Sequence, residues 1–296
     1  MSASKRDFLR IADLSSVELE AVLADARAIK ADRHGPRSLQ GRSVALIFEK
    51  SSTRTRVSFE VGVVQLGGHP VVLSGRDMQL GRGESIEDTA RTLSRYVDAI
   101  VLRTMGHDRV ERMAAAASVP VVNALTDDHH PCQIVADLQT VEERRGTLKG
   151  LRYAWIGDAN NVARSWVEAA GLLGLALTVA SPEGYAFAAT ELPPGVRQVR
   201  DPAEAVAGAD VVVTDVWASM GQEEEAARRR EAFAGYRVDA SLLRGAAPSP
   251  VVLHCLPAHR GEEITAEFLD GPDAAVWDEA ENRLHAQKAL LRFLVR

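Results

Sequence analysis

The stretch from Gly150 to Ala180 decides the fold, and its sequence is GLRYAWIGDANNVARSWVEAAGLLGLALTVA. A β-rich run at 153–156 is followed by a turn, by apolar residues at helical spacing over 162–173, and by a second β-rich run at 176–180. This order predicts two parallel strands joined by a crossover helix. Both runs are almost entirely apolar, which is typical of parallel strands covered on both faces.

The same alternation extends in both directions. We predict further strands at 43–48, 71–73, 99–102, 119–123, 211–214, 250–254 and 275–277, and further helices at 15–29, 53–66, 84–96, 107–117, 130–145, 201–208 and 281–295. The expected fold class is α/β, with two doubly wound parallel-sheet domains joined by two interdomain helices. We expect the first domain at 1–147, completed by the C-terminal helix 281–296, and the second at 148–280.

Composition and charge exclude several classes of protein. The net charge of -6 argues against nucleic acid as the main partner, and no apolar run is long enough to span a bilayer. The basic run 228–230 follows the acidic run 223–225, so we interpret it as a solvated helix face. The N-terminus lacks the apolar core of a secretory signal, and the only two cysteines match no metal-ligand spacing. We therefore expect a cytoplasmic protein.

An anion site is predicted where the strand at 43–48 meets the next helix. The segment is Phe48-Glu49-Lys50-Ser51-Ser52-Thr53-Arg54-Thr55-Arg56. A helix N-terminus presents free backbone N–H groups, and the hydroxyl and guanidinium groups here add donors for an anion. Arginines in a first helical turn oppose the helix dipole unless an anion binds there. The alternative is a capped helix with surface arginines, of which Arg56 also suits an ion pair inside the domain.

Other polar groups follow the remaining predicted strands, where α/β proteins bind ligands. They lie in the segments 78–85, 103–104, 130–133, 157–161, 215–221, 254–257 and 282–285. Alone, each has an ordinary structural explanation. His130 suits a cap or the core, Arg103 the surface, Asn161 a helix cap, and Cys255 a small buried apolar position. Leu256-Pro257 is a plausible cis-proline site.

Taken in order, these segments resemble the aspartate/ornithine carbamoyltransferase family. Ser52-Thr53-Arg54-Thr55-Arg56 is similar to its carbamoyl-phosphate signature, although Ser51 stands where the ornithine enzymes usually have Pro. The resemblance implies that Ser52, Thr53, Arg54, Thr55 and Arg103 hold the phosphate, and that His130, Thr55 and Arg103 face the carbonyl oxygen. It also implies that Gln133 and the Leu256 carbonyl contact the carbamoyl NH2 group, and that Cys255 binds carbamoyl phosphate near the ornithine side-chain amine. Further contacts with carbamoyl phosphate are implied for Arg283 and for Gln79 of a neighbouring chain in a homotrimer. No metal or organic cofactor is implied.

The second half resembles the family's amino-acid site. Asp215, three residues and then Ser219-Met220-Gly221 match the ornithine-specific signature. The resemblance implies that Asn161, Asp215, Ser219 and Met220 bind L-ornithine, whose side-chain amine attacks carbamoyl phosphate to give citrulline. Our hypothesis is that Asp215 binds the α-ammonium group and Cys255 helps to deprotonate the amine. The polar stretch 222–230 suggests that the Ser-Met-Gly loop closes over ornithine.

Three alternatives remain open at this point. One is a carbamoyltransferase for aspartate, putrescine or a modified ornithine, against which the Ser-Met-Gly signature argues. Another is an α/β dehydrogenase, which the single glycine at Gly157 disfavours because a dinucleotide-binding loop has three. The last is a non-catalytic relative, which would be expected to have broken motifs.

Overall fold

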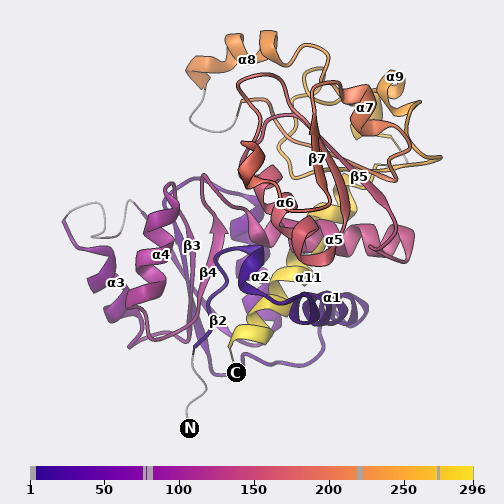
Figure 1. The fold of residues 1–296 in the computed structure, drawn as a ribbon. Coiled ribbons are helices and arrows are strands. Elements are labelled where there is room, and N and C mark those ends of the chain that lie inside the picture. Colours follow the sequence, from indigo (N-terminus) through magenta and orange to yellow (C-terminus); the bar gives the residue numbers. More distant parts are fainter. Residues whose placement is uncertain (1–4, 76–77, 79–82, 219–222, 272–273, 296) are drawn as a thin grey trace. The chain divides into compact units, whose positions relative to one another are not determined.

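The computed structural model describes residues 5–75, 78, 83–218, 223–271 and 274–295. The chain divides into two compact units, Met1–Gln139 with Glu281–Arg296, and Thr140–Ala280. Helices α5 (Pro131–Arg145) and α11 (Val276–Leu294) each contain one of the unit boundaries, so these two helices carry the chain between the units (Figure 1). Each unit is a parallel sheet flanked by helices, which confirms the predicted fold class.

The first unit is built on a four-stranded parallel sheet of order β2-β1-β3-β4. Its strands are β1 (Ser43–Phe48), β2 (His69–Ser74), β3 (Ala99–Arg103) and β4 (Val121–Leu125). Its helices, besides parts of α5 and α11, are η1 (Ile11–Asp13), α1 (Ser16–Ala31), α2 (Arg54–Gln65), α3 (Ile86–Leu93) and α4 (His107–Ala116).

Side chains of the first sheet alternate between two helical layers. Ala45, Ile47, Ile100 and Leu102 belong to a buried cluster that includes apolar residues of α3 and α4, which lie side by side (Figure 1). On α2, Gly62 allows close approach to α11, because a Cβ there would lie 3.2 Å from the Lys288 side chain. Helices therefore cover the strands while leaving their carboxyl ends to the loops.

The second unit has a five-stranded parallel sheet of order β7-β6-β5-β8-β9. Its strands are β5 (Arg152–Ile156), β6 (Ala176–Ala180), β7 (Val196–Val199), β8 (Val211–Thr214) and β9 (Val251–His254). Its helices are α6 (Asn161–Leu173), η3 (Ala189–Glu191), α7 (Pro202–Val206), η4 (Glu223–Glu225), α8 (Ala226–Ala232), α9 (Ala240–Leu243) and α10 (Ala266–Leu269).

The core of the second unit lies on both faces of its sheet. Tyr153 packs against Trp166 of α6, with ring centroids 5.7 Å apart. Ala154 and Ile156 alternate with Tyr153 along β5 and therefore point to the other face of the sheet, where they belong to a buried cluster that contains Phe233. None of the helices within the described residues has the length and apolarity needed to cross a membrane.

Most predicted elements are present, and one predicted strand is wrong. The strands at 43–48, 176–180 and 211–214 have the predicted bounds. The predicted strand at 275–277 is absent, because α11 begins at Val276 and its first turn buries this apolar residue. The stretch 223–230 forms η4 and most of α8, which agrees with the helix expected at 228–230. The short edge strand β7 was not predicted.

Both sheets reverse their strand order at one point. In the first sheet the reversal lies between β1 and β3, and in the second it lies between β5 and β8. Loops that leave adjacent strands at such a point diverge to opposite faces, and the crevice between them is the usual ligand site of open α/β sheets. Each unit therefore has one favoured position for a site.

Candidate functional site

In the first unit, the predicted anion loop lies at the strand-order reversal. It follows β1, while Arg103 ends the adjacent strand β3. Thr53 is the N-cap of α2 but makes no side-chain cap, and the Thr55 amide instead donates to Ser52 Oγ at 3.2 Å. The loop therefore brings hydroxyl groups and Arg54 to the first turn of a helix, where the dipole favours an anion.

Two buried guanidinium groups meet on one hydroxyl in this region. Arg103 Nη1 donates to Thr55 Oγ1 at 3.3 Å, and Arg283 Nη2 donates to the same oxygen at 3.2 Å. The three residues are 8%, 3% and 2% exposed, in the order Arg103, Arg283 and Thr55. Two guanidinium groups that converge on one hydroxyl suit an anionic ligand, because guanidinium donors form strong hydrogen bonds with phosphate oxygens.

Gln133 extends this network along α5. Arg283 Nη1 donates to Gln133 Oε1 at 2.5 Å, and Gln133 Nε2 donates to Asp137 Oδ1 at 2.8 Å. The amide orientation is fixed, since its oxygen faces a cation and its nitrogen faces a carboxylate. Gln133 thereby links the cationic cluster to an acidic group one turn further along the helix.

His130 stands beside the same cluster and is buried. Its pKa lies well below the ordinary value for histidine, first because burial disfavours the charged ring, and then because of the positive charges of Arg283, Arg103 and Arg54. The imidazole is therefore neutral near pH 7. A neutral ring still donates one hydrogen bond, so His130 is suited to polarise a carbonyl oxygen without carrying a charge.

In the second unit, polar groups from three adjacent strand ends meet at Asp215. Cys255 Sγ, after β9, donates to Asp215 Oδ1 at 3.2 Å. Asn160 Nδ2, after β5, donates to Asp215 Oδ2 at 2.7 Å. Asp215 is 7% exposed, so both carboxylate oxygens are held in a mostly buried place. An anchored carboxylate of this kind suits an ammonium ligand.

The loop after β9 is also fixed by buried groups. The Leu256 amide donates to His254 Nδ1 at 2.9 Å, and His254 Nε2 lies 3.0 Å from Glu263 Oε1. Leu256 has a φ of 58°, and its bond to Pro257 is cis, as the sequence predicted. The left-handed backbone at Leu256 is unfavourable for a branched residue, and the hydrogen bond to His254 stabilises it.

Among the described residues, two groups near this loop have the donor atoms of a metal site, and the second is His259, Glu262 and Glu263. Asp215, His254 and Cys255 each offer a ligand atom within 4.8 Å of the others. Both ring nitrogens of His254 already face other partners, the Leu256 amide and Glu263. A metal ion would have to displace one of them, so the group is better described as a hydrogen-bonded network.

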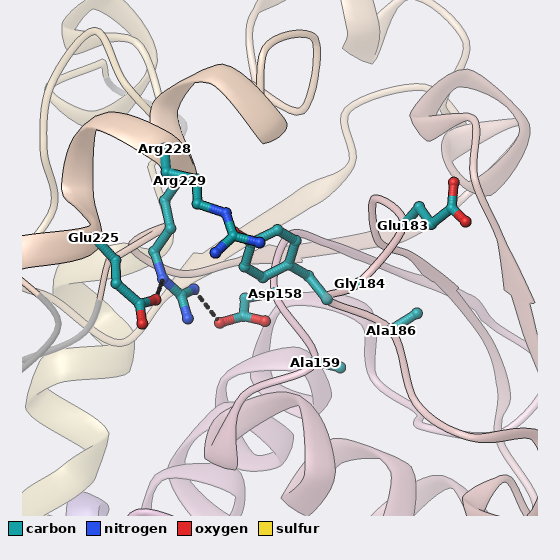
Figure 2. A pocket seen from close by; sticks show the side chains of 9 residues that line it. Asp158, Ala159, Glu183, Gly184, Ala186, Glu225, Arg228 and Arg229 are labelled. Atoms are coloured by element: carbon teal, nitrogen blue, oxygen red, sulfur yellow. Dashed lines mark hydrogen bonds and ion pairs between the residues drawn. The ribbon is translucent and has the colours of Figure 1, made fainter.

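A polar pocket of about 410 Å³ lies at the carboxyl ends of β5 and β6. Figure 2 shows Arg229 of α8 directed toward Asp158 and flanked by Glu225. Arg229 Nη1 donates to Asp158 Oδ2 at 2.7 Å and to the Trp217 carbonyl at 2.9 Å. Burial raises the pKa of Asp158, while the hydrogen bond and charge of Arg229 oppose that rise.

This pair corrects the interpretation of 228–230 as a solvated helix face. Arg229 is only 6% exposed, and its guanidinium carbon lies 4.9 Å from the centre of the Tyr185 ring. The acidic partner, Asp158, is far away in the sequence, so the pairing required the tertiary fold. Arg228 and Arg230 on either side are exposed, as predicted.

The structure brings together many, but not all, of the predicted site residues. Thr55, Arg103, Gln133 and Arg283 share one network in the first unit, while Asp215 and Cys255 are hydrogen-bonded in the second. Gln79, Ser219 and Met220 lie outside the described residues. Arg56 is exposed, with its Nε 3.6 Å from Glu60 Oε2 within α2, which agrees with the structural alternative.

Two residues of this region were not predicted from the sequence. The N-cap of α6 is Asn160 and not Asn161, which begins the helix. Both are asparagines at a helix start, so local propensity does not separate them. Arg229 was also missed, although a basic residue next to an acidic run is a weak signal of its kind.

Comparison with known proteins identifies the family. Residues 6–143 match the aspartate/ornithine carbamoyltransferase carbamoyl-P binding domain, and residues 149–294 match the Asp/Orn binding domain. Together the two matches cover most of the chain. The chain belongs to the aspartate/ornithine carbamoyltransferase family.

Individual relatives agree with this assignment. An ornithine carbamoyltransferase from Acidothermus cellulolyticus is 58% identical, over 98% of this chain and 96% of the relative. The solved structure of ornithine carbamoyltransferase from Pyrococcus furiosus is 46% identical, with a TM-score of 0.93 over 100% of this chain and 98% of the other. That of an anabolic ornithine carbamoyltransferase from Campylobacter jejuni is 36% identical, with a TM-score of 0.92 over 98% of both chains.

Proposed function

We propose that this chain transfers the carbamoyl group of carbamoyl phosphate to the side-chain amine of L-ornithine, giving L-citrulline and phosphate. The observation that carries the proposal is the buried cationic cluster at the first strand-order reversal, in a chain whose family binds carbamoyl phosphate with this domain. The reaction forms a C–N bond, breaks the C–O bond to phosphate, and releases the amine proton.

The first unit supplies the groups for carbamoyl phosphate. In our proposal Ser52, Thr53, Arg54, Thr55 and Arg103 bind the phosphate, with Arg283 as a further cation. Attack by the amine places negative charge on the carbonyl oxygen, and preorganised donors stabilise that charge. Arg103, Thr55 and the neutral ring of His130 are the proposed donors. Gln133 and the Leu256 carbonyl are assigned to the carbamoyl NH2 group.

The second unit supplies the groups for ornithine. We assign the α-ammonium to Asp215 and the α-carboxylate to Asn161, which lies in the first turn of α6, where the helix dipole favours an anion. Ser219 and Met220 complete the proposed site. An amine like that of lysine, with a pKa of about 10.4, is protonated near pH 7, and only its neutral form attacks. Cys255, hydrogen-bonded to Asp215, is the proposed aid to deprotonation.

Product formation with parallel acceptors tests this function. Purified protein and carbamoyl phosphate are incubated with L-ornithine, aspartate, N-acetylornithine or putrescine, and the carbamoylated product and phosphate are both measured. Product with ornithine alone is expected. Turnover of another amine only would overturn the assignment of the acceptor, and no turnover by folded protein would favour a non-catalytic relative.

A pair of arginine variants tests the phosphate site within the same assay. Arg103→Gln removes one of the buried cations, and we expect kcat/KM for carbamoyl phosphate to fall by about 100-fold or more, because a buried charged hydrogen bond is lost. Arg112→Gln is the control, since Arg112 lies on α4 in an exposed ion pair with Glu87. An equal effect of the two changes would contradict the role of Arg103.

We also infer a homotrimer in which Gln79 of one chain contributes to the site of a neighbouring chain. This inference rests on the family resemblance of the segment 78–85. Light scattering after gel filtration should give three times the 32.0-kDa chain mass. A monomer with full activity would contradict the shared site.

We further propose a role in arginine biosynthesis in the cytoplasm. The description of the Campylobacter jejuni relative as anabolic supports the direction, and the two free cysteines suit a reducing compartment. Rates of citrulline formation and of its phosphorolysis, measured side by side, test the direction.

A further inference from the structure

The N-cap of α6 makes one contact more than a cap requires. Asn160 Oδ1 accepts from the amides of Val162 and Ala163, both at 3.0 Å. Two backbone donors on one side-chain oxygen satisfy the first turn of the helix. The other end of the same amide, Nδ2, donates to Asp215 Oδ2 at 2.7 Å.

These contacts fix the orientation of the Asn160 amide. If the group were turned over, its NH2 would face two N–H donors and its oxygen would face the Asp215 carboxylate. Each of those contacts is repulsive, so only one orientation is compatible with the surroundings. The donor directed at Asp215 is therefore a consequence of the helix cap.

The sheet places this amide close to Asp215. Strands β5 and β8 are adjacent, with Ile156 paired to Thr214, and Thr214 Oγ1 donates to the Ile156 carbonyl at 2.7 Å. Asn160 follows the first of these strands, and Asp215 follows the second. The hydrogen bond between Asn160 and Asp215 therefore joins the two loops that follow a pair of adjacent strands, whose register places the loops close together.

The choice of residue at position 160 has a physical explanation. Asn, Asp and Ser are about equally good N-caps, so the cap alone does not require an asparagine. Only asparagine among them joins an acceptor for the helix amides to an NH2 donor for a neighbouring carboxylate. Aspartate would keep the cap but bring a second carboxylate oxygen to 2.7 Å from the first.

We propose that Asn160 is a positioning residue for the acceptor substrate: it holds the Asp215 carboxylate in the orientation that receives an amino-acid ammonium group. Cys255 restrains the other oxygen of the same carboxylate, at 3.2 Å. This inference rests on the proposed function, because it assigns the ammonium to Asp215. Asn160 itself is not a catalytic residue, since it acts through Asp215.

Replacement of Asn160 by aspartate or serine tests the proposal. Asn160→Ser keeps a capping oxygen and removes the donor, and the expected loss in kcat/KM for L-ornithine is about tenfold to a hundredfold, the usual effect of a hydrogen bond to a charged group. Asn160→Asp adds repulsion and should lose more. In both, KM for carbamoyl phosphate should change by less than about threefold, because the residues proposed to bind its phosphate lie in the first unit.

A control isolates the effect of the cap. Asp239 caps α9 in the same way, with its Oδ1 accepting from the amides of Ser241 and Leu242 at 2.9 and 3.0 Å. Asp239→Asn exchanges the same two residue types at a cap without a neighbouring Asp215. It should leave both KM values unchanged, and its melting temperature gives the stability effect of the exchange together with the loss of the ion pair between Asp239 and Arg237.

A double variant distinguishes positioning from general stability. In Asn160→Asp with Asp215→Asn, the donor and acceptor change places and the hydrogen bond is restored. The melting temperature should return toward that of the parent, while ornithine turnover stays low, because the charge at 215 is gone. Restored ornithine turnover in the double variant would overturn the proposal.

The outcomes separate this inference from the proposed function. If the parent protein forms no citrulline, the proposed function fails before any variant is compared. If the parent is active and Asn160→Ser and Asn160→Asp both keep its KM and kcat for ornithine, the positioning role of Asn160 is wrong and the function stands. If the variants lose activity only in step with their melting temperatures, Asn160 is a structural cap and the inference is also wrong.

Discussion

The ion pair between Arg229 and Asp158 gives a prediction whose magnitude follows from burial. The side chains of Arg229 and Asp158 are only 7% and 12% exposed, so little of either partner is in contact with water. Arg229→Met keeps much of the side-chain length and removes the charge. Removing one partner of a buried pair costs about 3–5 kcal/mol, because the other charge stays buried without compensation.

Several contacts adjust this figure. The carbonyl of Trp217 loses a donor, which costs about 1 kcal/mol, and the Tyr185 ring loses a cation, which costs about 0.5–1 kcal/mol. Against this, burial already raises the pKa of Asp158, so its carboxyl can take up a proton once Arg229 is gone. We therefore expect a loss of about 3 kcal/mol in the free energy of unfolding of the second unit.

Tryptophan fluorescence can follow the unfolding of the second unit by itself. All four tryptophans of the chain, at 155, 166, 217 and 277, lie in Thr140–Ala280, so their emission during urea unfolding reports the second unit. The double variant with Asp158→Asn has no buried charge at this place, and it should be more stable than Arg229→Met alone. The coupling energy in the cycle should be about 2 kcal/mol.

Arg230→Met is the matched control. Arg230 is the next residue on α8, and its ion pair with Glu262 is exposed, which makes a change of less than about 1 kcal/mol the expected result. A coupling energy below about 0.5 kcal/mol between Arg229 and Asp158, or an equal loss in Arg230→Met, would refute the reasoning.

Other predictions concern the cationic cluster, the buried histidines and the cysteines. Thr55→Val removes the oxygen shared by two arginines and should raise KM for carbamoyl phosphate about tenfold or more; an unchanged KM would contradict the proposed site. Burial lowers the pKa of several histidines, so on acidification the unfolded chain binds protons at a higher pH than the folded chain does. The free energy of unfolding should therefore fall below pH 6.5, by up to about 1.4 kcal/mol per pH unit for each histidine. Urea midpoints that do not change from pH 7 to pH 5 would argue against this. These histidines are His107, His130 and His285. Cys255→Ala should lower turnover and move the pH–rate profile, and an unmoved profile would count against its role in deprotonation. Burial raises the pKa of the Cys132 thiol to about 12, so in the native protein a thiol reagent should modify Cys255 and not Cys132; rapid modification of both would show that Cys132 is accessible.

Most helices and strands could be predicted from the sequence, because the spacing of apolar residues along the chain matches the period of the element that forms. The strand at 211–214 consists only of Val and Thr, which both favour a β-strand. At 275–277, by contrast, Val276 and Trp277 favour a strand, but they begin α11, whose first turn buries Val276 and leaves Trp277 exposed. A three-residue segment holds too little information to choose between these outcomes.

The candidate site was predictable where a residue carries its own signal. Arginines in a first helical turn conflict with the dipole, and this conflict alone marked the segment 52–56 as a place for an anion. Asn160 carried no such signal, because two adjacent asparagines at a helix start are equivalent until the backbone assigns the cap. Arg229 likewise differs from its neighbours only through the position of Asp158.

The α/β class and the order of the elements follow from the amino-acid sequence, because periodicity and side-chain chemistry along the chain are enough to predict them. The tertiary structure alone decided which strands are neighbours, and therefore which distant polar groups meet. The order β5-β8-β9 brings Asn160, Asp215 and Cys255 together, and the end of β3 brings Arg103 to Thr55. Hydrogen bonds and ion pairs require separations of a few ångströms, and for residues 40 or more positions apart only the folded chain sets them.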